Sequence, residues 1–141
     1  MIWRRSTPPL RGRRLLLALA LAAGACSSND SNTRALDHEI DQVLRCTVPE
    51  GARVSGTAPL RRGRSSAETS WEVEAEQGWS SYQAALERDA RAAGYQPGAP
   101  PGEAKASFLK PEAGDTYYLE VELLDQGPPI RVRVRFAARA G

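Results

Sequence analysis

The chain has 141 residues, 41% of them apolar and 26% charged, with 19 basic and 17 acidic side chains. This length suits one small domain with a single hydrophobic core. The first 25 residues hold five arginines and no acid, so the other 116 residues carry 14 basic and 17 acidic side chains, a net charge of −3. That balance gives no electrostatic reason to expect a nucleic-acid partner, and we expect none.

The first 25 residues have the pattern of an export signal. All five arginines precede an apolar stretch of eleven residues that begins at Leu15 and ends at Ala25. A basic segment, a short apolar segment and small residues at the end are the parts of a secretory signal peptide. Eleven helical residues span only about half of a hydrocarbon core roughly 30 Å thick, so we expect no membrane-spanning helix here.

Cys26 follows the small residues Ala23-Gly24-Ala25, and this makes the segment resemble the signal peptide of bacterial lipoproteins. The resemblance implies cleavage between Ala25 and Cys26 and acylation of Cys26 as the mature N-terminus. Ala23 stands where lipoprotein signals usually have leucine, so an ordinary signal peptide, cut before an unmodified Cys26, is the alternative. Arg13-Arg14 resembles a twin-arginine export signal, although we favour a plain basic segment.

The lipoprotein resemblance also predicts a location. One acyl chain holds a protein on a membrane only marginally, and stable anchoring needs a second hydrophobic signal. Lipoproteins of this type carry a diacylglycerol on the cysteine, often with a further acyl chain. Ser27, and not aspartate, follows Cys26, which in a two-membrane bacterium implies the periplasmic face of the outer membrane. We expect residues 27–33, which are small and polar, to form a flexible tether.

Two elements are expected between the tether and residue 66. Apolar positions in residues 34–45 fall on one helical face, which predicts a short helix; they are Leu36, Ile40, Val43 and Leu44. Residues 52–58 form a weak strand pattern with a single large apolar residue, Val54. Residues 60–66 contain Arg61, Arg62 and Arg64, and we expect them to form a mobile basic loop.

A strand and a helix are expected next. Residues 70–76 alternate between apolar and acidic side chains, as in a half-buried strand. Residues 80–93 have the spacing of a helix, with Ser80 and Gln83 as a capping box and Gly94 just beyond the end. Residues 96–104 hold three prolines and two glycines and are expected to be a loop, which leads to a strand over residues 105–110.

The last forty residues predict a hairpin of strands 117–124 and 130–136. Apolar side chains of the two strands must share one face, and a one-residue slip would turn them away from it. Pairing residue 123 with 130 and residue 121 with 132 satisfies this condition and places Glu122 opposite Arg131 and Glu120 opposite Arg133. The connecting loop would then be residues 125–128.

These elements predict a single α+β domain over residues 34–141. We expect a two-layer sandwich in which an antiparallel sheet of about four to five strands, in the order β-β-α-β-β-β, has one covering helix and a short N-terminal helix before it. The 80–93 helix would be the cover. The expected core is Trp71, Trp79, Tyr82, Leu86, Phe108, Leu119, Val121, Val132, Val134 and Phe136.

The spacing of several residues resembles a pattern of small exported bacterial domains to which no activity is assigned. It comprises Pro49-Glu50-Gly51-Ala52, the aromatic and apolar positions Trp79, Tyr82 and Leu86, then Gly94-Tyr95, and finally Phe108 with Lys110. The resemblance covers residues 49–136. These are packing motifs, so the resemblance implies the fold and carries over no catalytic residue.

No residue pattern predicts a catalytic, cofactor or metal site. His38, the only histidine, falls on the polar face of the first helix, about 12 Å from Cys46 if that helix continues, too far for a hydrogen bond. One histidine and scattered acids lack metal-ligand spacing. The strand glutamates fall on solvated faces without the enclosed pocket that a general acid needs. We expect a protein that is not an enzyme and needs no cofactor.

Cys46 is the remaining thiol if Cys26 is acylated. In an oxidising compartment it would be a buried inert thiol, which we favour, or an intermolecular partner, or a reactive site. Without acylation, a Cys26–Cys46 disulfide becomes the further alternative.

The sequence therefore favours an envelope lipoprotein that acts as a non-catalytic binding or scaffold module. Its partners would be the membrane, through the lipid on Cys26, and a protein or envelope surface. We expect Arg61, Arg62 and Arg64, together with the outer sheet face, to form the contact, although a solvated loop explains the arginines as well. The alternatives are an inhibitor or immunity lipoprotein against an envelope enzyme or toxin, and a cell-wall hydrolase.

Overall fold

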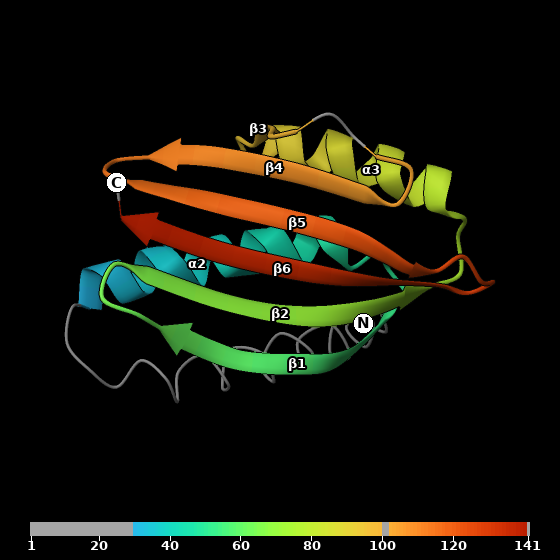
Figure 1. Cartoon of the computed structure of the whole chain (residues 1–141), viewed down its shortest axis with the longest axis horizontal. Helices are drawn as coiled ribbons and strands as arrows, with labels where there is room; N and C mark the ends of the chain where they lie inside the picture. Colours follow the sequence, from blue (N-terminus) through green and yellow to red (C-terminus); the bar gives the residue numbers. More distant parts are fainter. Residues whose placement is uncertain (1–29, 100–101, 141) are drawn as a thin grey trace, which may run out of the picture.

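Alternating apolar and polar residues build one antiparallel sheet, covered by helices on its apolar face (Figure 1). The computed structural model describes residues 30–99 and 102–140, so the signal segment and Cys26 lie outside the described residues. The elements are α2 (Asp30–Thr47), β1 (Arg53–Arg62), β2 (Ser66–Ala75), α3 (Trp79–Ala92), β3 (Gln96–Pro97), β4 (Lys105–Glu112), β5 (Asp115–Asp125) and β6 (Ile130–Ala140). The strand order across the sheet is β1-β2-β6-β5-β4-β3.

The predicted α+β class and antiparallel sheet are confirmed, but the sheet has six strands and not four to five. The sixth is β3, a two-residue strand inside the expected loop 96–104. Two helices, and not one, cover the sheet: α2 lies behind β6 and β2, and α3 lies behind β4 (Figure 1). Six strands about 4.8 Å apart are roughly 24 Å wide, which a single helix about 10 Å across cannot cover.

The prediction of a mobile basic loop over residues 60–66 is wrong. β1 continues to Arg62, and β2 already begins at Ser66, so the connection is a tight turn in which the Gly63 N–H donates to the Ser66 carbonyl over 2.7 Å. β1 is an edge strand with mostly exposed side chains on both faces. An edge strand of this kind has no apolar alternation, and therefore the sequence pattern does not reveal its full length.

The N-terminal helix also begins earlier than expected. α2 starts at Asp30, so residues 30–33, which we expected in the tether, are helical. Asp, Ser and Asn are residue types favoured at helix N-termini, and the negative charge of Asp also suits the positive end of the helix dipole, which explains how a polar segment joins the helix.

The last hairpin confirms the predicted faces and corrects the predicted register. Leu123 pairs with Val132 and Val121 with Val134, two residues away from the expected pairs. A shift of two residues keeps every side chain on its face, so face matching excludes a one-residue slip but not this one. The loop is residues 126–129, and the strands are irregular between Leu123 and Asp125.

Charge pairing does not distinguish the two registers either. The observed register places Glu122 opposite Arg133 and Glu120 opposite Arg135, so glutamates again face arginines. The pairs that we expected, Glu122 with Arg131 and Glu120 with Arg133, have the same chemistry.

The two ends of α3 differ in how well the sequence predicted them. The capping box is wrong, because the helix begins at Trp79 after Gly78 and has no side-chain cap hydrogen bond. Trp79 instead stacks on Tyr82, with ring centroids 5.9 Å apart, and its Nε1 donates to the Glu103 carbonyl. The C-terminal end is confirmed: Gly94 has a φ of 97°, and the Tyr95 N–H donates to the Ala90 carbonyl over 2.9 Å, as in a Schellman motif.

The predicted core is confirmed with one exception. Nine of the ten expected core residues are buried, and Trp79 is half-buried against them. α2 adds Leu36, Ile40, Val43 and Leu44 to the same core. The helical layer therefore covers the apolar face of the sheet, and the charged outer face is left open to solvent.

Candidate functional site

The outer face divides into two halves. In the half toward the β5–β6 loop, cross-strand ion pairs use most of the charges. Arg133 lies 3.8 Å from carboxylate oxygens of both Glu72 and Glu122, and Arg53 pairs with Glu74. Exposed pairs of this kind contribute at most about 1 kcal/mol each to stability. They nevertheless leave few unpaired charges in this half of the face to bind a partner.

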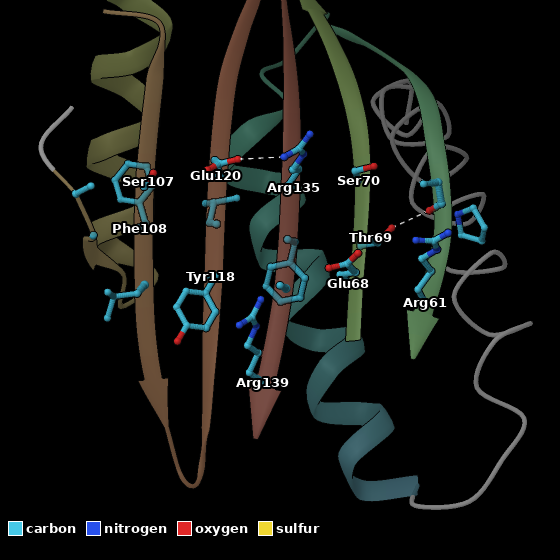
Figure 2. Close-up of a pocket in the computed structure, with 18 residues that line it drawn as sticks. Arg61, Glu68, Thr69, Ser70, Ser107, Phe108, Tyr118, Glu120, Arg135 and Arg139 are labelled. Atoms are coloured by element: carbon cyan, nitrogen blue, oxygen red, sulfur yellow. Dashed lines mark hydrogen bonds and ion pairs between the residues drawn. The ribbon is translucent and has the colours of Figure 1, made fainter. Parts of the chain in front are cut away.

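The other half is hollowed into a cavity of about 930 Å³, which we call the outer groove (Figure 2). Two neighbouring rows of outward side chains cross it from β1 to β4. The first row is Ala58, Ser70, Arg135, Glu120 and Ser107, and the second is Arg61, Glu68, Ala137, Tyr118 and Leu109. Small side chains on four of these positions leave the hollow, and β1 and residues 98–99 form its walls.

Tyr118 is the most unusual side chain of the outer groove. It is 41% exposed and is the only large apolar side chain so exposed within residues 30–99 and 102–140. Its neighbour across the sheet is Ala137, which leaves the ring uncovered on that side. The Arg139 guanidinium lies over the ring, 5.7 Å from its centroid (Figure 2). The pair thus forms a flat apolar surface next to a cation.

Two arginines of the outer groove have no ion pair within the described part of the chain. They are Arg61 and Arg139, whereas Arg135 is 3.6 Å from Glu120. Glu68 stands opposite Arg61 in the strand register and makes no ion pair with any described residue, so the groove also holds an unpaired acid beside its two unpaired arginines. A guanidinium binds carboxylates and phosphates through two parallel hydrogen bonds. The groove is therefore suited to an oxyanion that stands beside a flat or apolar group.

The structure separates the three arginines that the sequence analysis grouped together. Arg61 lines the outer groove. Arg62, the next residue of the strand, pairs with the inward Ala67 and stands close enough to Asp37 of α2 that its charge lowers the pKa of that carboxyl, against a larger rise caused by burial. Arg64 lies in the β1–β2 turn and is exposed. Only Arg61 belongs to the candidate site.

A polar cluster inside the sandwich was not anticipated. Glu39 of α2 is 4% exposed, and the Lys110 Nζ lies 3.0 and 3.1 Å from its two oxygens. The Tyr95 hydroxyl donates to the same carboxylate over 2.7 Å, and burial together with this bond raises the pKa of Tyr95. The position of each residue in the sequence pattern could have indicated this cluster. Glu39 stands within the apolar stripe of α2, and Lys110 follows Ala106 and Phe108 at every second residue on the inward side of β4. The cluster joins α2 to the sheet.

The structure places no catalytic or metal constellation among its described residues. No group of three metal-ligating side chains occurs within residues 30–99 and 102–140. His38 is exposed on α2, and its Nε2 atom lies 3.4 Å from the Nε2 atom of Gln42. In the described part of the chain no helix is long and apolar enough to cross a membrane.

Cys46 is a free thiol in the last turn of α2 and is half-buried. Burial raises the pKa of this thiol to about 11, with smaller contributions from the charges of Asp89 and Glu39. Cys26 lies outside the described residues, so a disulfide between the two remains an alternative.

We expect Cys46 to alkylate slowly at pH 8 and faster as the pH approaches 11, because only the thiolate reacts. The folded state favours the protonated thiol, so its stabilising contribution is complete below about pH 9 and is lost as the pH rises toward 11. Iodoacetamide labelling followed by mass spectrometry, with the urea-unfolded chain as control, measures the rate. A folded chain that reacts as fast as the unfolded one at pH 8 would contradict the buried thiol.

Comparison of the chain with protein-family models, curated proteins and solved structures finds no match. The geometry of the outer groove is therefore the basis for a functional proposal.

Proposed function

We propose that the chain is an exported, lipid-anchored and non-catalytic binding module whose partner docks in the outer groove. The observation that carries this proposal is the combination of a cavity of about 930 Å³ with the exposed Tyr118 and two arginines without an ion pair. A concave site that combines an apolar surface with a few convergent polar groups is the usual form of a ligand-binding site. The signal segment before Cys26 supports the anchored location.

The chemistry of the groove describes the partner. Arg61 and Arg139 fit a carboxylate or a phosphate, and the Tyr118 ring with Leu109 fits a flat or apolar group beside it. Glu68 makes a purely anionic ligand less suitable and favours a partner segment with mixed charge. A protein or a wall component of the envelope surface has these features.

The acids of the groove favour binding over catalysis. Glu120 is held by Arg135 at 3.6 Å and Lys105 at 3.5 Å, and Glu68 is exposed. Hydrolysis by two carboxylates needs one acid in an apolar enclosure that keeps it protonated, and neither residue has such surroundings.

In cells of the native host, a photo-crosslinking side chain in place of Ala137, on the groove floor, should capture the partner. The same side chain in place of Arg88, which is exposed on α3 in the opposite layer, should not. The double variant Arg61→Gln/Arg139→Gln should reduce the adduct at least about tenfold, because two charge-assisted contacts are lost.

The control for charge is Arg53→Gln/Arg131→Gln, which removes two arginines from the ion-paired half of the same face. It should leave the adduct unchanged. Equal loss in both double variants, or equal capture from residues 88 and 137, would contradict docking in the outer groove.

A further inference from the structure

The two ends of the sandwich differ in what they carry. One end, which we call the anchor end, holds the first residues of α2, the β1–β2 turn, the β4–β5 turn and the end of β6 (Figure 1). The Ala140 N–H donates to the Ser65 carbonyl over 2.8 Å, which ties the end of β6 to the β1–β2 turn. The far end holds the α2–β1, β2–α3 and β5–β6 connections.

The sequence restricts how far the anchor end can lie from Cys26. α2 begins at Asp30, only four residues after Cys26. Four residues of extended chain reach at most about 14 Å. If Cys26 carries the lipid, the first turn of α2 is therefore held within this distance of the membrane surface, and the anchor end is the part of the domain nearest to the lipid.

The anchor end also carries exposed arginines without ion pairs in the described chain. They are Arg34 in the first part of α2, Arg62 at the end of β1 and Arg64 in the β1–β2 turn. Three acids oppose them at the same end: Glu112 and Asp115 beside the β4–β5 turn, and Asp37 of α2, which stands near Arg62. Arg34 and Arg64 are exposed and make no ion pair in the described chain, so the side formed by α2 and the β1–β2 turn is the basic one. Each connection of the far end has an exposed acid in it or directly beside it: Glu50, Glu76 and Asp125, the last residue of β5.

We propose that the domain stands on the membrane with its anchor end down and that Arg34, Arg62 and Arg64 contact anionic lipid headgroups of the leaflet that holds Cys26. Basic residues next to an anionic surface are attracted to it, and the acids of the far end are repelled, so both effects favour one orientation. The outer groove then opens sideways, parallel to the membrane, and stays accessible to its partner. This inference rests on the lipid anchor of the proposed function.

The orientation can be measured with two labels at opposite ends. Ser65→Cys places a thiol in the β1–β2 turn and Gln126→Cys places one in the β5–β6 loop, both exposed. Neutral maleimide labelling selects these thiols, because the pKa of Cys46 is raised to about 11. The acylated chain, verified by its mass, is placed in vesicles of phosphatidylcholine, with or without phosphatidylglycerol, that carry a quencher on the lipid headgroup.

We expect the label at residue 65 to be quenched several-fold more than the label at residue 126 in vesicles that contain phosphatidylglycerol. The double variant Arg62→Gln/Arg64→Gln should reduce that difference at least about twofold. The matched control, Arg53→Gln/Arg131→Gln, removes two arginines near the far end and should not reduce it.

Equal quenching at both positions, or stronger quenching at residue 126, would overturn the orientation. A preference that survives both Arg62→Gln/Arg64→Gln and the removal of phosphatidylglycerol would overturn the headgroup contact. If the mass shows no acyl chain, the anchor of the proposed function fails separately. The same two labels on a Cys26→Ser variant, added from solution to anionic vesicles, then still decide whether this end meets the headgroups.

Discussion

Replacing Lys110 by methionine should destabilise the fold by about 3–5 kcal/mol, because it leaves the Glu39 carboxylate buried without its cation. The side chains of Lys110 and Glu39 are only 14% and 5% exposed, so water cannot replace the lost partner. The Tyr95 hydroxyl would remain as the single donor to the carboxylate. Urea unfolding of the detergent-solubilised mature protein, followed by tryptophan fluorescence, measures the loss.

The matched control removes the whole cluster. In the triple variant Glu39→Met/Lys110→Met/Tyr95→Phe, no charge or hydroxyl group of the cluster is left buried and unpaired. Apolar replacement of a complete buried ion pair is often neutral or stabilising, so this variant should recover most of the stability that Lys110→Met loses. If the triple variant is less stable than Lys110→Met, the cluster stabilises the fold by more than the pairing of its own buried charges, and our explanation is wrong.

Replacing Phe136 by alanine should cost about 3–5 kcal/mol, since it opens a cavity in the middle of the sandwich. Phe136 is fully buried on the inward face of β6 and stacks on Tyr117, with ring centroids 5.8 Å apart. Urea unfolding again measures the effect.

The control is Tyr118→Ala on the neighbouring strand. Tyr118 faces the outer groove and is already 41% exposed, so its removal should cost less than about 1 kcal/mol while weakening capture of the partner by the groove. The two aromatic side chains thus separate stability from binding. Similar losses of stability in both variants would contradict the assignment of the two faces.

The sequence predicted well those elements whose burial is one-sided. α3 and the strands β2, β5 and β6 have a clear apolar face, and the helix also has the Gly94 signal at its end, so their existence and inward faces were correct. The strands are longer than expected: β2 begins four residues earlier and β6 ends four residues later. β1 and β3 were misjudged because edge strands contact the core little and their side chains follow no apolar alternation. The hairpin register was ambiguous by two residues because both registers satisfy the same apolar and charge matching.

The candidate site could be predicted only in small part. Arg61 was expected at the contact, but its separation from Arg62 depends on the alternation of a strand that the sequence pattern did not show. The outer groove depends on small side chains that four strands bring into two rows, and Tyr118 becomes exposed because Ala137 stands beside it. These neighbours are set by the register, and the register was the feature that the sequence left undetermined.

The intact mass of the protein extracted from its native membranes tests the anchored-module proposal most directly. We expect a chain of 116 residues that begins at Cys26 and carries the added mass of a diacylglycerol, with or without a further acyl chain. A chain that begins at Cys26 without added mass, or one that retains the first 25 residues, would contradict the lipid anchor. A mass lower than the unmodified value by two hydrogen atoms would instead indicate a Cys26–Cys46 disulfide in a soluble exported protein.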